Sequence, residues 1–131
     1  MTALVKEATV EDILAQNIEM VEEGMTLLNR QRETEVGRID LFAKDKAGTY
    51  TIIELKKGRT DDEVFGQLSR YMGWCRKTHA RTERVRGIII AGQIGPKLWA
   101  AADGHNSPVE LMIYDLKVHI GRAVRPAPPG R

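Results

Sequence analysis

Cysteine is almost absent from this 131-residue sequence, in which Cys75 is the only one. A lone cysteine excludes an internal disulfide and is typical of a protein kept in a reducing compartment. Cys75 falls on an apolar stripe at helical spacing, and no neighbouring pattern marks it as catalytic. We therefore expect a buried thiol and not a nucleophile.

Long apolar runs are also missing. No basic start leads into a long apolar segment, so the sequence predicts neither a signal peptide nor a membrane span. We expect a cytoplasmic protein without a membrane partner. The three histidines, His79, His105 and His119, lack metal-ligand spacing and are interpreted as surface residues.

The sequence also lacks a large excess of either positive or negative charge. The 20 Lys and Arg residues nearly balance the 18 Asp and Glu residues, for a net charge of +2. No overall basic field therefore attracts nucleic acid. Local clusters remain candidates for phosphate contacts, and we select Arg38, Lys57, Arg59 and Arg70. For the basic group in residues 81–86, solvation of a surface explains the charges equally well.

The composition that is present belongs to one globular domain, with 42% hydrophobic and 29% charged residues. Hydrophobic patterns predict the order α-β-β-β-α-β-α-β, which is an α/β fold with a mixed β-sheet flanked by helices. Residues 122–131 are rich in proline and are predicted to form a flexible tail. Residues 1–121 then make up a single domain.

Two adjoining strands are predicted in the first half of the chain. Residues 38–44 alternate polar and apolar side chains, and residues 50–55 are rich in β-branched and aromatic types. A three-residue loop at 46–48 would place Gly48 in the left-handed conformation that such hairpins favour.

This loop length brings two acids together. Counting down the hairpin from the loop sets Asp40 directly opposite Glu54, and Lys56 projects from the same face two residues later. A loop shorter by one residue would put the two acids on opposite faces. The register therefore decides whether the three side chains form one site.

Asp40 and Glu54 would repel each other unless a positive charge lay between them. Mg²⁺ takes oxygen ligands and usually one or two protein carboxylates plus substrate phosphate. Such an ion polarises the phosphate and lowers the pKa of a bound water, while Lys56 would position that water or neutralise developing charge. Taken alone, the three residues are better explained as a solvated charge cluster on an exposed sheet face.

A helix is predicted over residues 61–77, because its acidic start and basic end match the helix dipole. Thr60 is the predicted N-cap, with Glu63 completing a capping box. Gln67 and Tyr71 are four residues apart and share a face. Chemistry alone leaves two interpretations of this pair open: a surface polar pair, or a pair that orients a metal-bound water or a phosphate.

Three motifs stand out together: Glu-Val-Gly-Arg-Ile-Asp at 35–40, Ile-Ile-Glu-Leu-Lys-Lys-Gly at 52–58 and Gln-Leu-Ser-Arg-Tyr-Met-Gly-Trp at 67–74. In combination they resemble the PD-(D/E)XK nuclease superfamily, and more narrowly the RecB-like nuclease domain of the NucS/EndoMS DNA endonucleases. The resemblance runs from Glu7 to Tyr114. It implies a restriction-endonuclease-like fold with an αβββαβ core.

The resemblance also implies roles for individual residues. Asp40 and Glu54 would be metal ligands and Lys56 the catalytic lysine, while Gln67 and Tyr71 match the family's Gln-x-x-x-Tyr motif. The superfamily's proline is replaced by Ile39 in this sequence, as in many RecB-like members.

A further metal ligand in the family is a glutamate on the first helix. Glu7 lies at the matching distance before Asp40, with Glu11, Glu22 and Glu23 as rivals.

The combined prediction is a Mg²⁺- or Mn²⁺-dependent endonuclease that acts on single- or double-stranded DNA. NucS/EndoMS enzymes carry an N-terminal domain for dimerisation and DNA binding, whereas this sequence starts at the nuclease part. We therefore expect an excised domain or a standalone relative with a separate targeting partner, and a homodimer would suit double-strand cutting. Two alternatives stay open: a catalytically silent module that binds nucleic acid or a partner, and a nuclease for RNA or branched DNA.

Overall fold

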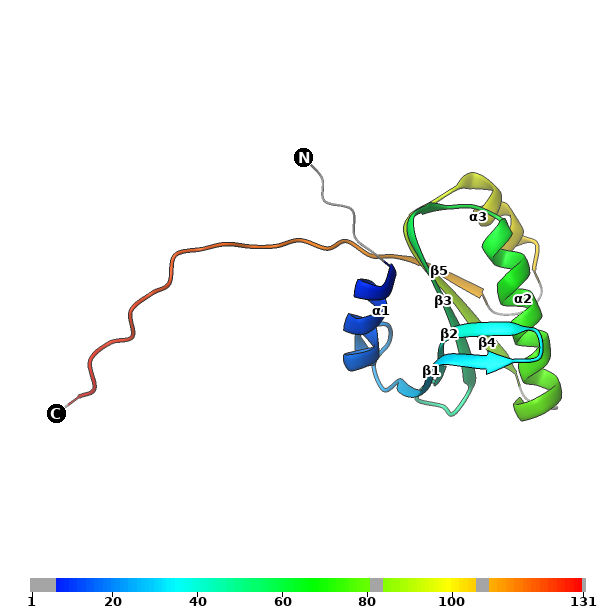
Figure 1. Ribbon diagram of the computed structural model, residues 1–131, viewed down its shortest axis with the longest axis horizontal. Helices are drawn as coiled ribbons and strands as arrows, with labels where there is room; N and C mark the ends of the chain where they lie inside the picture. The colour runs from blue at the N-terminus through cyan, green and yellow to red at the C-terminus, as the bar shows by residue number, and fades with distance from the viewer. Residues whose placement is uncertain (1–6, 81–83, 106–108, 131) are drawn as a thin grey trace.

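The computed structural model describes residues 7–80, 84–105 and 109–130 and has three layers (Figure 1). A central sheet lies between α1 on one face and α2 with α3 on the other. The order of helices and strands predicted from the sequence is confirmed. In chain order these elements are α1 (Glu7–Gln16), β1 (Thr26–Thr34), β2 (Gly37–Lys44), β3 (Tyr50–Thr60), α2 (Glu63–Cys75), β4 (Val85–Ile94), α3 (Pro96–Asp103) and β5 (Val109–Ile113).

The strands lie side by side in the order β1-β2-β3-β4-β5. The first three are antiparallel, whereas β4 and β5 run parallel to β3. A parallel neighbour requires a crossover connection, which α2 supplies between β3 and β4 and α3 supplies between β4 and β5. The start of α2 therefore lies close to the end of β3.

Helices bury both faces of the sheet, which explains the continuous apolar run of β4. On the α1 side, Val10 and Leu14 belong to one buried cluster with Leu41, Ile53 and Ile88. The cluster on the α2 side consists of Ile39, Phe42, Ile52, Val64, Leu68, Tyr71, Met72, Cys75, Val85, Ile89 and Leu98.

Cys75 is fully buried in the α2 cluster, as predicted. Burial raises the pKa of its thiol to about 11. The thiol is therefore protonated at neutral pH and unsuited to act as a nucleophile.

The β2–β3 hairpin has the predicted three-residue loop. The N–H of Asp45 donates to the carbonyl of Thr49 at 2.9 Å, and the N–H of Gly48 donates to the carbonyl of Asp45 at 2.9 Å. Gly48 has a φ of +86°, the left-handed conformation that glycine adopts without a steric penalty. The ladder keeps this register down to Leu41 opposite Ile53.

Two predicted boundaries near the end of β3 were wrong. The sequence places Thr60 at the N-cap of α2, but Thr60 is the last residue of β3. The helix begins at Glu63, and its cap residue Asp62 makes no side-chain capping hydrogen bond. β3 is longer than the sequence predicts because it pairs with β4 again beyond a register shift between Lys56 and Arg59.

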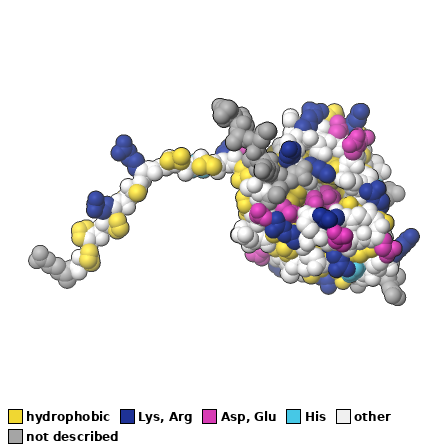
Figure 2. Space-filling view, viewed as in Figure 1, with side chains coloured by type: hydrophobic (Ala, Val, Ile, Leu, Met, Phe, Trp, Pro, Cys, Tyr) yellow, Lys and Arg dark blue, Asp and Glu magenta, His cyan; other side chains and the backbone are white. Residues whose placement is uncertain are grey.

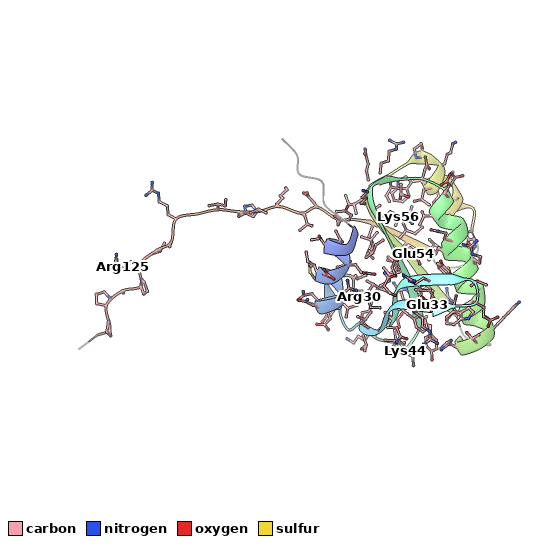
Figure 3. All side chains as sticks on the ribbon, viewed as in Figure 1. Arg30, Glu33, Lys44, Glu54, Lys56 and Arg125 are labelled. Atoms are coloured by element: carbon pink, nitrogen blue, oxygen red, sulfur yellow. The ribbon has the colours of Figure 1, made fainter. Side chains whose placement is uncertain are left out.

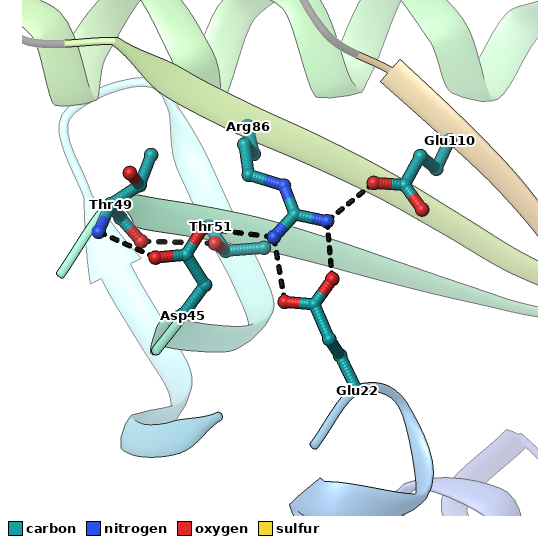
Figure 4. Close-up of polar contacts among 6 residues, drawn as sticks. All are labelled: Glu22, Asp45, Thr49, Thr51, Arg86 and Glu110. Carbon is teal, nitrogen blue, oxygen red and sulfur yellow. Dashed lines mark hydrogen bonds and ion pairs between the residues drawn. The ribbon is translucent and has the colours of Figure 1, made fainter. Parts of the chain in front are cut away.

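Arg86 on β4 connects the turn of this hairpin to two other parts of the chain (Figure 4). Its guanidinium donates to Glu22 at 2.7 and 2.8 Å and to Asp45 at 2.9 Å, and it also contacts Glu110 on β5. The hydrogen bond from Arg86 lowers the pKa of Glu22. The pKa of Asp45 is also lowered, because its hydrogen bonds outweigh the opposing effect of burial.

The segment after β5 runs away from the body of the protein (Figure 1). Residues 114–130 form no helix or strand, and Val118, Ile120 and Val124 are exposed. Residues 115–120 therefore neither extend β5 nor form a further strand. Among the residues that the structure describes, no helix combines the length and apolar character needed to cross a membrane.

Candidate active site

Asp40 lies where β2 and β3 stop pairing. The last pair of the ladder is Leu41 with Ile53, so the predicted pairing of Asp40 with Glu54 lies one step beyond the pairs that the two strands form. The backbone N–H of Leu55 donates to Oδ2 of Asp40 at 2.8 Å. The Asp40 carboxylate thus occupies the position of a strand partner and is held against β3.

Glu54 is the buried acid of the pair. It is 3% exposed, and its Oε1 has no hydrogen-bond partner among the described residues. Burial, followed by the charge of Asp40, raises the pKa of Glu54 to about 9. At neutral pH such a carboxyl is protonated unless a positive charge lies beside it. Figure 3 labels Glu54 and Lys56 on β3, of which Glu54 is buried and Lys56 is half-buried.

This pair of acids fits a hard divalent cation. Carboxylate oxygens are the ligands that Mg²⁺ and Mn²⁺ prefer, and an ion held by two carboxylates keeps positions for water and phosphate. A cation would give Oε1 of Glu54 a partner and would cancel the repulsion from Asp40. Within the described residues, no group of three or more His, Cys, Asp or Glu could hold a metal ion. Glu7 opens α1, but its side chain lies outside the described part, so its assignment as a ligand stays a prediction.

Lys56 and Gln67, two of the predicted site residues, lie close together. Both line a pocket of about 250 Å³ between the end of β3 and the first turns of α2, with Thr60, Glu63 and Val64 as the other lining residues. The side chains of Lys56 and Gln67 therefore border one space, whose lining does not include Asp40 or Glu54.

Tyr71 lies one turn further along α2 and is 5% exposed, so it is not part of a surface polar pair. Its hydroxyl packs on Gly37, where an added Cβ would lie 2.6 Å from Oη. Gly37 also has a φ of +129°, so both its backbone and its surroundings require glycine. Tyr71 thus packs α2 against Gly37, the first residue of β2.

Glu11, one of the rivals of Glu7, is the first-helix glutamate that the structure places beside Asp40. It is 6% exposed, and its Oε2 accepts hydrogen bonds from Arg30 at 2.9 and 3.0 Å. Its Oε1 accepts a hydrogen bond from the side-chain amide of Gln31. The same amide lies 3.4 Å from Oδ1 of Asp40.

The other rivals lie elsewhere. Glu22 is bound to Arg86 at the turn end of the hairpin, and Glu23 is exposed. Gln31 is a residue that the sequence analysis missed. It belongs to no motif, and nothing in the sequence signals its contact with Asp40.

The four residues selected as phosphate contacts are all exposed: Arg38, Lys57, Arg59 and Arg70. Arg38 donates to Glu33 at 2.8 Å, and the guanidinium of Arg70 lies 5.9 Å from the centre of the Tyr71 ring. Lys57 and Arg59 lie at the register shift of β3, directly after Lys56. Acidic and basic side chains are interspersed on the face in Figure 2, in agreement with the small net charge.

A mixed five-stranded sheet with flanking helices defines this protein as restriction-endonuclease-like in fold. A solved repair endonuclease from Pyrococcus abyssi shares the fold, with a TM-score of 0.76 at 23% identity over 88% of this chain and 49% of that one. An EndoMS complex with dsDNA is also similar, with a TM-score of 0.78 at 21% identity over 91% of this chain and 48% of that one.

The chain belongs to the family described as the Endonuclease NucS C-terminal domain, which it matches over residues 6–112. Endonuclease NucS 1 of Halobacterium salinarum is 35% identical over 91 residues, which are 70% of this chain and 38% of that protein. Endonuclease NucS of Parafrankia sp. is 33% identical over 109 residues, or 83% of this chain and 49% of that protein. The chain thus spans about half the length, or less, of these curated relatives.

Proposed function

We propose that this chain is the nuclease unit of a NucS-type DNA endonuclease and hydrolyses phosphodiester bonds with Mg²⁺ or Mn²⁺. The observation that carries the proposal is Glu54, a buried carboxyl with an unpartnered oxygen and a raised pKa beside Asp40. A buried carboxyl with an unpaired oxygen does not stabilise a hydrophobic core, since an unpaired buried polar atom is unfavourable. A cation site, in contrast, requires a carboxylate oxygen as a ligand. Membership of a family whose curated relatives are called endonucleases supports the same conclusion.

Each residue of the site has a role in this proposal. Asp40 and Glu54 hold the ion, with Glu7 as the expected third ligand, and the N–H of Leu55 keeps the Asp40 carboxylate in place. When bound, the ion polarises the phosphate and lowers the pKa of a coordinated water. These carboxylates would fill only part of the coordination sphere and would leave the other positions to water and substrate.

Lys56 and Gln67 act from the pocket between β3 and α2. The ammonium of Lys56 positions the attacking water or neutralises charge that develops on the phosphate. The amide of Gln67 donates to a phosphate oxygen, and Tyr71 sets the distance between α2 and β2. Charges on the surface then contact flanking phosphates, which makes binding weaker as salt rises: Arg38, Lys57, Arg59 and Arg70.

The domain organisation is part of the proposal. We assign catalysis to residues 1–121 and treat residues 122–131 as a flexible tail outside the site. One copy presents one Asp40–Glu54 pair, so cutting both strands of a duplex at once needs two copies. A further domain or a separate protein supplies the choice of target.

A cleavage panel tests the proposal. Single-stranded, duplex, mismatched, flapped and branched DNA, together with RNA, are incubated with Mg²⁺, with Mn²⁺ and with EDTA. We expect cleavage of at least one DNA substrate that requires the divalent ion. DNA that is bound but left intact with either ion would favour a binding module, and cleavage of RNA alone would also overturn the proposal.

Lys56→Met separates catalysis from binding, because it removes the ammonium and keeps both carboxylates. We expect DNA cleavage to fall by about 100-fold, the usual effect of losing one charge-stabilising group, with little change in DNA affinity. Lys97→Met, an exposed lysine on α3, is the control and should cleave like the wild type. Equal cleavage by Lys56→Met and the wild type would remove Lys56 from the mechanism.

A further inference from the structure

Gln31 has a backbone conformation that side chains rarely adopt. Its φ is +52°, and it is the one non-glycine residue with a positive φ among those the structure describes. It lies in the middle of β1, where an extended backbone is the rule. A non-glycine residue stays in this left-handed region only when its surroundings fix it there, and such residues gather at functional sites.

The side chain of Gln31 explains what fixes the backbone. Its Nε2 donates to Oε1 of Glu11 and lies 3.4 Å from Oδ1 of Asp40. An amide nitrogen carries two N–H donors, so one group serves two carboxylates from different elements. Glu11 lies on α1, which covers one face of the sheet, and Asp40 lies on β2, the strand next to β1. The Gln31 side chain on β1 thus links the two acids.

The other oxygens of the two acids are also engaged. Arg30 donates to Oε2 of Glu11 at 2.9 and 3.0 Å, and the N–H of Leu55 donates to Oδ2 of Asp40 at 2.8 Å. Figure 3 shows Arg30 next to α1. Glu11 thus has both oxygens bound by donors of β1, which suits a residue that orients the Gln31 amide better than a metal ligand.

We infer that Gln31 is a positioning residue that fixes Asp40 for the divalent cation, and this inference rests on the proposed function. Each carboxylate oxygen has more than one lone pair, so Asp40 can accept from Gln31 and still bind an ion. A neutral donor is suited to this place. Lysine or arginine would bring a positive charge to the carboxylate and compete with the cation for it.

Calorimetric titration of Mn²⁺ into the full chain tests the inference with Gln31→Gly and Gln31→Asn. Glycine accepts the positive φ and removes the amide, whereas asparagine tolerates this φ and carries its amide one methylene short of the acids. Both variants should bind Mn²⁺ about tenfold more weakly or worse, because losing a partner of a metal ligand usually lowers affinity 10- to 100-fold. Both variants should still fold, with unfolding temperatures close to that of the wild type, because relief of the positive φ offsets the hydrogen bond lost to Glu11.

Asn29→Gly is the matched control, since Asn29 is an exposed residue of the same strand. It should lower stability slightly and leave Mn²⁺ affinity unchanged. Wild-type affinity in both Gln31 variants would overturn the inference and leave the proposed function intact. Unfolding of both variants would overturn it too, by making Gln31 a structural residue. A wild-type protein that binds no Mn²⁺ would overturn the inference and the proposed function together.

Discussion

At the scale of the residue, Glu54 is unfavourable for the fold without a metal. Its pKa is 4.5 for an exposed glutamate and about 9 in the folded protein, mainly because the carboxyl is buried and secondly because of the charge of Asp40. An acid with a raised folded pKa binds its proton more tightly when folded. The folded state therefore loses stability as the pH rises from 4.5 towards 9, where the unfolded chain releases the proton and the folded one does not.

Glu54→Gln removes this pH dependence, because the amide resembles the protonated carboxyl. In EDTA at pH 5 the variant and the wild type should have similar free energies of unfolding. Towards pH 9 the free energy of unfolding of the wild type should drop below that of the variant, by up to about 1.4 kcal/mol per pH unit. Urea unfolding across this range is the measurement, and adding Mg²⁺ to the wild type should narrow the gap. A gap that does not change with pH would show that the pKa of Glu54 is ordinary.

At the scale of the element, the hairpin could be predicted because its determinants are local. The hydrogen bonds that Asp45, Gly48 and Thr49 make with one another lie within five residues of sequence. Once the loop length is known, the period of two fixes that Asp40 meets Glu54. The start of α3 is also a local feature, because Pro96 is its first residue and proline favours the first turn of a helix.

Other features of the elements depend on contacts that are distant in sequence. Thr60 has the chemistry of a helix cap, yet it pairs with Ile94 and extends β3. Non-local strand pairing outweighed the local capping signal there. Gln31 is a second example, because its backbone depends on Glu11 of α1 and Asp40 of β2. No single-sequence pattern shows that these three side chains meet.

At the scale of the whole molecule, Arg86 joins three segments that lie far apart in the sequence. Its side chain is 16% exposed, and its carboxylate partners come from the segment before β1, the hairpin turn and β5. Removing one partner of such a network leaves the other buried charges uncompensated. The resulting loss of stability is usually larger than the net stabilisation that the intact network provides. The cluster lies at the turn end of the hairpin, away from Asp40.

Arg86→Met should lower the free energy of unfolding by about 3 kcal/mol at pH 7. The difference should shrink in acid. Glu22 and Asp45 have lower pKa values in the folded protein than in the unfolded chain, so their ionised carboxylates stabilise the fold at neutral pH. This stabilisation is lost as the pH falls through their folded-state pKa values. Arg84→Met, an exposed neighbour, should change stability by less than about 0.5 kcal/mol. Equal effects of the two substitutions in thermal melts would contradict this role for Arg86.

The central claim is that Asp40 and Glu54 form a cation site for DNA cleavage, and that the fold does not require the carboxyl of Glu54. Cleavage of the substrate found in the panel, measured with Mg²⁺ and with Mn²⁺ for the wild type, Asp40→Asn and Glu54→Gln, tests it most directly. The account predicts that both variants lose cleavage, while Glu54→Gln unfolds in EDTA at pH 8 at a higher temperature than the wild type. Cleavage by either variant at the wild-type rate would contradict the account.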